Sequence, residues 1–303
     1  MSGVNKGLSA RMKECSPPLA VYVHCYGHLL NLALQDAMTT VEPMRNTLGT
    51  IQSVYNFLEA SPKRHALFGD IETEDCSLLT TSKSQSVTRW SCWWEAVNAI
   101  DQRLERIVKA LLVLSTDRDA ETCSESRSLL HGICDFQFVL GLCVLKIILS
   151  NTSSLSCYLQ GKTVDVIAAR RNTKLTLETL RSCRNDENFT LVWKRCEIIG
   201  VKIKSWIAES DFLSRDARVP RRQPSTRLQG LVGENQNASA AGPPSKPEDY
   251  RRVHTFFSSL DKVLVEIESR FSRNDQDVLC ALGEVTLRVP PTSESFDVVA
   301  GYY

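Results

Sequence analysis

Apolar residues recur every three or four positions along most of this chain, and that spacing is typical of amphipathic helices. The most regular pattern begins near Trp90 and continues to Leu111, with its apolar side chains on one face. Similar patterns predict helices over residues 28–38, 44–62, 126–149, 165–182, 189–207 and 250–271. Few strands remain to be assigned, so we predict a mainly α fold.

Three segments depart from helical periodicity. Residues 65–87 are polar and rich in Ser and Thr, which predicts a loop. Residues 214–248 hold much Pro, Gly, Asn and Ser and little that could be buried, which predicts a disordered linker. Residues 19–24 form a short β-prone run after a Pro-Pro pair, which predicts one buried strand.

The composition sets limits on function. The chain has 303 residues, of which 43% are hydrophobic, and this is enough to bury a core. Lys and Arg total 36 against 35 Asp and Glu, so no overall positive field would concentrate the chain on DNA or on an anionic membrane. Nucleic-acid contact would need a local patch. Arg221 and Arg222 belong to such a basic stretch, which either touches phosphates or is simply solvated.

The compartment follows from cysteine usage and the absence of a leader. The 11 Cys are odd in number and several lie in apolar runs, which favours free thiols in a reducing environment. No apolar run follows the first charged residues, so we expect no signal peptide and no secretion. The apolar stretch 136–149 is too short to cross a bilayer and carries Lys146, so it is predicted to be a buried helix.

Cys25 and His28 lie three residues apart where the predicted strand leads into the first helix. They could supply two zinc ligands, with Cys15 or His24 as further candidates, but the second pair of a structural zinc site is missing. We therefore expect neither a metal nor a cofactor. A Cys/His hydrolase is a second interpretation, since imidazole can activate a thiol, but no orienting third group can be named.

The whole run from Val21 to Asp36 resembles the strand-to-helix segment of hAT-family transposases and of host proteins derived from them, including the zinc-finger MYM-type relatives. In that segment a hydrophobic strand precedes Cys-x-x-His and Leu-Asn-Leu. The residues that match in order are Cys25, His28, Leu30, Asn31 and Leu32.

A second segment, Thr88-Arg89-Trp90, resembles the Arg-Trp motif that opens a long helix in this family. The resemblance implies that Trp90 stacks on a displaced base and that Arg89 contacts a phosphate. The other interpretation is that Trp90, Trp93 and Trp94 form an aromatic cluster facing the core.

Two further segments, residues 155–160 with Asp165 after them and Ser269-Arg270-Phe271, resemble parts of the family's helical insertion domain, so the resemblance covers nearly the whole chain. It implies a partial ribonuclease H-like α/β remnant at the N-terminus followed by an all-helical insertion domain. The implied division is as follows: the remnant at 1–90, the insertion domain at 91–213, the disordered linker at 214–248, and the last helices of the insertion domain with a tail at 249–303.

The resemblance also bears on catalysis. Members of the family cleave DNA with three acidic residues that hold two divalent ions. Two of these acids are expected before Met1-Ser2-Gly3 and the third after Tyr303, while Glu284 and Glu294 match no family motif. We therefore expect no catalytic residue and no enzymatic activity in this chain.

The sequence thus predicts a non-catalytic fragment derived from a hAT transposase, acting as a protein-interaction or DNA-associated module. Expected partners are a second copy, another protein or, weakly, DNA, with no membrane and no small-molecule substrate. The alternatives are a subunit of an active DNA transposase and a degenerate relic without function. Because the family acts on chromosomal DNA, a nuclear location is expected, and otherwise a cytoplasmic one.

Overall fold

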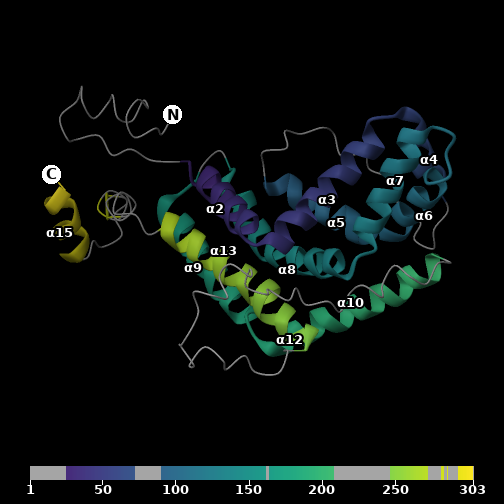
Figure 1. The fold of residues 1–303 in the computed structure, drawn as a ribbon. Coiled ribbons are helices and arrows are strands. Elements are labelled where there is room, and N and C mark those ends of the chain that lie inside the picture. The colour runs from purple at the N-terminus through teal and green to yellow at the C-terminus, as the bar shows by residue number, and fades with distance from the viewer. Residues whose placement is uncertain are drawn as a thin grey trace, which may run out of the picture.

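A computed structural model of the protein describes residues 25–71, 90–161, 164–207, 246–271, 281–282, 285 and 293–302. Within these ranges every regular element is a helix (Figure 1). The helices are α2 (Tyr26–Thr40), α3 (Glu42–Glu59), α4 (Pro62–Asp70), α5 (Trp90–Gln102), α6 (Leu104–Leu114), α7 (Ala120–Ile133), α8 (Phe136–Leu159), α9 (Val166–Cys183), α10 (Asp186–Trp206), α12 (Pro247–Arg251), the π-helix η2 (Arg252–Phe257), α13 (Ser258–Phe271) and α15 (Ser293–Tyr302). The prediction of a mainly helical chain is therefore confirmed.

The 24-residue helix α8 is the centre of the bundle (Figure 1). It packs against α3, α5, α9 and α10, and its buried residues lie on every side of the helix. Among the described residues it is the one helix long and apolar enough to cross a membrane, but 67% of its apolar window is buried inside the bundle. The prediction of a buried helix is thus supported, although the sequence underestimated the length of the helix, which continues to Leu159.

A close crossing joins α3 and α8. A Cβ atom added to Gly141 on α8 would lie 2.0 Å from Oγ1 of Thr47 on α3. The Thr47 hydroxyl is held in place because it donates a hydrogen bond of 2.8 Å to the carbonyl of Pro43. Only glycine leaves room for two helices to approach this closely.

Two predicted helices are each divided in the structure. The predicted helix from Trp90 to Leu111 forms α5 and α6, which are separated at Arg103. The predicted helix over residues 126–149 likewise includes parts of α7 and α8. The break comes at Asp135, whose side chain accepts a hydrogen bond of 3.0 Å from the backbone N–H of Gln137 and so caps the start of α8. Apolar spacing continues across both breaks, so periodicity alone did not reveal them.

The loop predicted for residues 65–87 is wrong in its first part, because α4 extends to Asp70. Pro62, which is predicted to end a helix, instead occupies the first turn of the next one, where a missing N–H costs nothing. α4 is anchored by buried Phe68 and by Arg64, whose guanidinium lies 4.2 Å from the ring centroid of Phe57. The remainder of the predicted loop, residues 72–87, lies outside the described residues.

The expected ribonuclease H-like α/β remnant is not shown. Residues 25–71 form α2, α3 and α4, and the described part of the chain contains no strand. The apolar residues of these helices are buried at helical spacing, and Met44, Leu48 and Ile51 of α3 are an example. The predicted strand over residues 19–24 and most of the predicted linker lie outside the described residues. The division into domains stays a prediction, although one apolar cluster includes side chains from α2 to α13.

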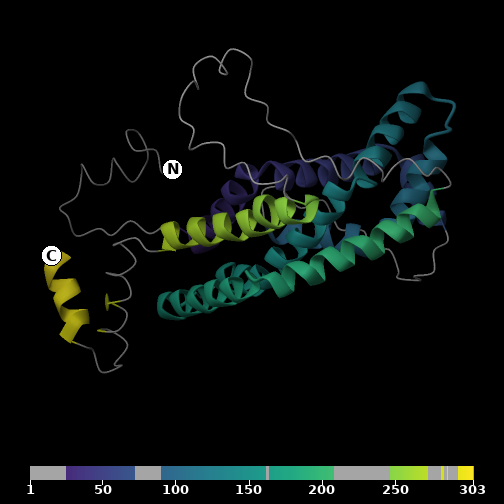
Figure 2. The same cartoon turned by 60° about the horizontal axis from the view of Figure 1, so that its bottom comes forward.

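The late helix α13 returns to the start of the described chain. It packs along α2 on one side and α9 on the other. In both views α13 runs beside α2, although more than 200 residues of sequence separate them (Figures 1 and 2). This return places two of the sequence motifs next to each other.

Candidate functional site

The Cys-x-x-His segment forms the first turn of α2. Cys25 is the N-cap residue, and its carbonyl accepts a hydrogen bond of 3.0 Å from the N–H of Leu29. The side chains of Cys25 and His28 are both exposed. Between them, buried Gly27 faces the end of α8, where an added Cβ would lie 3.2 Å from the carbonyl oxygen of Leu159. Within this motif, Gly27 therefore allows α2 to approach the end of α8 closely, and Cys25 and His28 are exposed on the surface.

Within the described ranges no group of three or more His, Cys, Asp or Glu side chains could hold a metal ion. Cys25 and His28 thus have no third ligand among those residues. Asn31, which matches the family pattern, is half-buried in the second turn of α2. These three residues thus lie at the N-cap and in the first two turns of α2.

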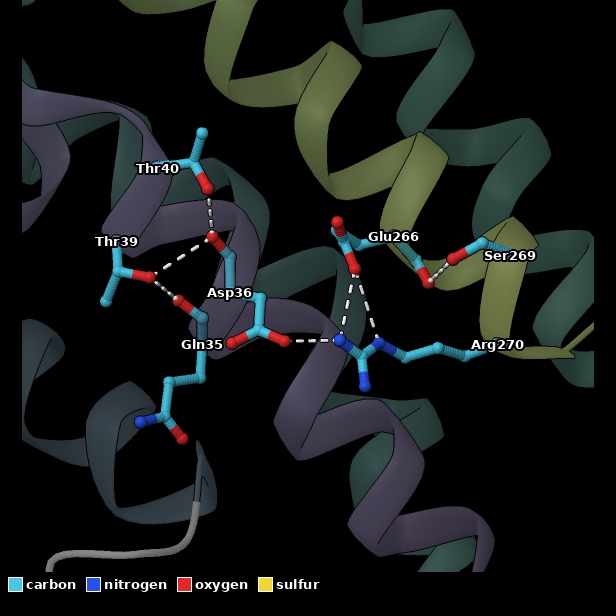
Figure 3. Close-up of polar contacts among 7 residues, drawn as sticks. All are labelled: Gln35, Asp36, Thr39, Thr40, Glu266, Ser269 and Arg270. Atoms are coloured by element: carbon cyan, nitrogen blue, oxygen red, sulfur yellow. Dashed lines mark hydrogen bonds and ion pairs between the residues drawn. The ribbon is translucent and has the colours of Figure 1, made fainter. Parts of the chain in front are cut away.

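The contact between α2 and α13 contains a charged bridge (Figure 3). The guanidinium of Arg270 on α13 donates to the carboxylate of Asp36 on α2. The same guanidinium donates to Glu266 one turn earlier, at 3.1 Å from Nη2 to Oε2. Asp36 is half-exposed, whereas only 18% of the Arg270 side chain is exposed, so the arginine lies between the two helices.

An aromatic pair completes this junction. The rings of Tyr26 on α2 and Phe271 on α13 are stacked, with centroids 6.1 Å apart. Tyr26 and Asp36 belong to the first family-like segment, Val21 to Asp36. Arg270 and Phe271 belong to the last one. Both segments are recognisable in the sequence, but neither carries a signal that they meet.

The tryptophan-rich start of α5 is described in part. Trp93 and Trp94 are half-buried and pack against the apolar core, as the interpretation of a core-facing cluster predicts. Trp90 is the first residue of α5, but its side chain lies outside the described residues, as does the whole of Arg89. Their predicted role in binding nucleic acid stays untested. The basic stretch with Arg221 and Arg222 also lies outside the described residues.

A small pocket opens where α2, α5 and α8 meet. Its volume is about 80 Å³. Its apolar wall consists of Leu34 from α2, Trp94 from α5 and Leu149 from α8. The remaining lining residues are Glu95, Thr152, Ser153, Ser156 and Cys157. The segment 155–160 and the Trp cluster both contribute to this pocket, but nothing in the sequence indicated that they lie close together.

The other residues of that segment have structural roles at helix ends. Gln160 follows the last turn of α8, and Asp165 is the N-cap of α9. The Asp165 carboxylate accepts hydrogen bonds from the backbone N–H groups of Ile167 at 3.1 Å and Ala168 at 3.3 Å. Gln160 and Asp165 therefore mark the end of one helix and the start of the next.

Sequence reasoning missed a buried carboxylate on α5. Asp101 is only 6% exposed and accepts hydrogen bonds from Lys146 on α8 and from Arg195 on α10, the latter at 2.7 Å to each oxygen. Two cations thus neutralise one acid and tie three helices together. Polar residues in an amphipathic pattern are normally exposed, and nothing in the spacing distinguished Asp101 from them.

Two buried thiols lie beside this cluster, Cys143 on α8 and Cys196 on α10. The hydrogen bond to Cys143, together with burial, raises the pKa of the Cys196 thiol well above its usual range. Burial also raises the pKa of Cys134 to about 12. The same hydrogen bond with Cys196 lowers the pKa of Cys143. Cys134 and Cys196 therefore remain protonated and act as small apolar residues, as the sequence predicted for cysteines inside apolar runs.

Comparison with known proteins gives distant similarities. No protein-family model matches the chain, and no solved structure matches it. Over 299 residues it is 26% identical to the human (Homo sapiens) protein named 52 kDa repressor of the inhibitor of the protein kinase. This match covers 93% of this chain and 36% of that protein. The mouse (Mus musculus) protein of the same name is 25% identical over 300 residues, covering 93% of this chain and 37% of its own length. The chain is thus distantly similar, along nearly all its length, to about a third of a repressor-named protein.

Proposed function

We propose that this chain is a non-catalytic helical module of hAT-transposase ancestry that binds another protein. Two findings support the proposal: the family-like segments occur in order along the chain, and the distant similarity to repressor-named proteins extends over 93% of it. A nuclear location belongs to the proposal, because both the family and a repressor would act there.

The pocket between α2, α5 and α8 carries the proposal of protein binding. Pockets for small-molecule ligands usually hold about 300–1,000 Å³. The volume of about 80 Å³ and the wall of Leu34, Trp94 and Leu149 suit one aliphatic side chain instead. Apolar anchors inserted into pockets dominate the binding energy of many protein interfaces. We therefore propose that a partner inserts one such side chain here.

The roles of the described acidic residues support a non-catalytic chain. A carboxylate that binds a catalytic divalent ion needs free oxygen atoms directed at a shared point. Asp36 and Asp101 instead make ion pairs with basic side chains. Other carboxylates cap helices, and these are Asp119, Asp135 and Asp165.

Selection of a helical peptide library on the intact chain would test protein binding. We expect the enriched peptides to share one apolar anchor residue. Their affinity should fall at least about tenfold for Ser153→Trp, which fills the pocket mouth with an indole ring, and should be unchanged for the matched neighbour Ser154→Trp, which does not line the pocket. Peptides that bind equally to both variants would contradict the assignment of this pocket.

Incubation of the purified chain with supercoiled plasmid and Mg²⁺ or Mn²⁺ tests the absence of catalysis. We expect no nicking and no strand transfer above the level without protein. Metal-dependent cleavage that disappears in a single variant, such as Asp36→Asn, would instead support the alternative of a transposase subunit. This outcome is separate from the peptide experiment, so the two parts of the proposal can fail independently.

A further inference from the structure

α10 has a second apolar stripe that the core does not use. Its inner face buries Phe189, Val192, Cys196 and Ile203. On the outer side Leu191, Ile198 and Val201 are 64%, 59% and 68% exposed, and they are among the most exposed large apolar residues described. A surface helix normally carries one apolar stripe, which faces its own core.

The exposed residues follow a regular spacing. Positions 187, 191, 194, 198, 201 and 205 alternate steps of four and three residues, which is the a/d repeat of a coiled coil. All six side chains are exposed. The seam extends along most of the 21 residues of α10, which corresponds to about 30 Å. We call this set of six positions the outer seam.

Among the described residues, the position of α10 leaves the outer seam accessible. The helix packs against α8 and α6, and it runs along one edge of the bundle (Figure 2). No part of the pocket between α2, α5 and α8 belongs to α10. The outer seam is therefore a surface separate from the one in the proposed function.

The outer seam begins with one exposed acidic residue, Glu187, and its charges beyond that position are mainly positive. Lys194 lies in the seam itself, and Lys202 and Lys204 flank it, all three exposed and, within the described residues, outside any ion pair. Arg195 is neutralised by Asp101, and Glu197 accepts a hydrogen bond of 3.1 Å from the indole N–H of Trp193. A partner helix with acidic flanks would complement this surface.

The same charges disfavour a second copy of the chain as the occupant. A parallel pair of α10 helices would place Lys194 against Lys194 in the seam. An antiparallel pair that aligns Leu191 with Val201 would bring the two Glu197 side chains together. Like charges in such positions destabilise helix pairing.

We propose that the outer seam of α10 binds an amphipathic helix of another protein that has an aliphatic a/d seam and acidic residues beside it. The apolar residues supply the attraction, and Lys194, Lys202 and Lys204 select the acidic partner. Helix-in-seam recognition of this kind uses anchors at positions i, i+3, i+4 and i+7.

A designed peptide of three to four heptads tests the proposal, with leucine at a and d, glutamate at e and g, and a fluorescent label. Mutual repulsion of the glutamates keeps the peptide itself monomeric. We expect saturable binding to the full chain by fluorescence anisotropy, weaker at high salt. A peptide with the same leucines but lysine flanks should bind at least about tenfold more weakly.

Three variants locate the binding. Ile198→Glu and Lys194→Glu should each weaken binding of the acidic peptide at least about tenfold. Leu175→Glu is the matched control, because Leu175 on α9 is 51% exposed but lies outside the seam. Circular dichroism of each variant establishes that the fold is retained, which is expected because all three positions are exposed.

Several results would overturn the proposal. These are an absence of saturable binding, equal affinity for the lysine-flanked peptide, or loss of binding in Leu175→Glu alone. Concentration-dependent dimerisation of the chain that disappears in Ile198→Glu would assign the outer seam to a second copy and would overturn the acidic partner.

Discussion

α8 and α10 are neighbouring helices of similar length, 24 and 21 residues, and both contain many apolar side chains. In α8 these side chains are buried on all sides of the helix, because α3, α5, α9 and α10 surround it. In α10 one stripe is buried and another, with Leu191, Ile198 and Val201, is exposed. Core packing explains the apolar side chains of α8 but only some of those of α10. An apolar residue of α8 therefore contributes to stability, whereas an apolar residue of α10 belongs either to the core or to the exposed stripe for which we propose a role in recognition.

The strongest test of this comparison is the same substitution in both helices. Leu140→Ala removes a fully buried side chain of α8 and should lower the free energy of unfolding by about 2–5 kcal/mol, through lost burial and the cavity left behind. Leu191→Ala on α10 should change it by no more than about 0.5 kcal/mol. Chemical denaturation followed by circular dichroism measures both. Equal losses would mean that the outer seam is part of the core after all.

A smaller effect is expected at the crossing of α3 and α8. Gly141→Ala places a methyl group against Thr47 and should destabilise the chain by about 1–3 kcal/mol, because two packed helices must separate. The control is Gly49→Ala on α3, where an added Cβ meets nothing within 4 Å. That change should stabilise the chain by about 0.5–1 kcal/mol, because alanine favours a helix interior. A stabilising Gly141→Ala would show that the crossing is looser than described.

The smallest of the three effects should be common to both helices, since each begins at a side-chain cap. Asp135 accepts from the N–H of Gln137 at 3.0 Å, and Asn185 accepts from the N–H of Asn188 at 2.7 Å. Asp135→Ala and Asn185→Ala should each cost about 1 kcal/mol, measured from thermal unfolding, whereas Asp135→Asn retains the cap and should cost less. If Asp135→Ala destabilised the chain but Asn185→Ala did not, the N-cap of α10 would make no contribution to stability.

Apolar periodicity predicted the helical class and located most helices, because burial of one face imposes a spacing near 3.6 residues wherever the chain later packs. It failed at Arg103 and Asp135, where the apolar pattern continues across the break between two helices. It also failed at α4, where Pro62 begins a helix rather than ending one. Proline is compatible with either role, so the residue type alone could not decide between them.

The candidate site was predictable only in its parts. The Cys25–His28 turn, the Trp cluster and the segment with Arg270 could each be recognised from local sequence. Their arrangement could not, because it depends on α13 returning to α2 and on α5 and α2 meeting over α8. Asp101 was missed for the same reason, since its cationic partners come from two other helices.

By itself the sequence determined the helical class, the position of most helices and which face of each is apolar. Only the tertiary structure decided what each face contacts: Arg270 against Asp36, Gly141 against Thr47, and nothing described against the outer seam of α10. The physical reason is that helical periodicity arises from contacts between neighbours in sequence, whereas the choice of partner depends on shape and charge that residues distant in sequence bring together.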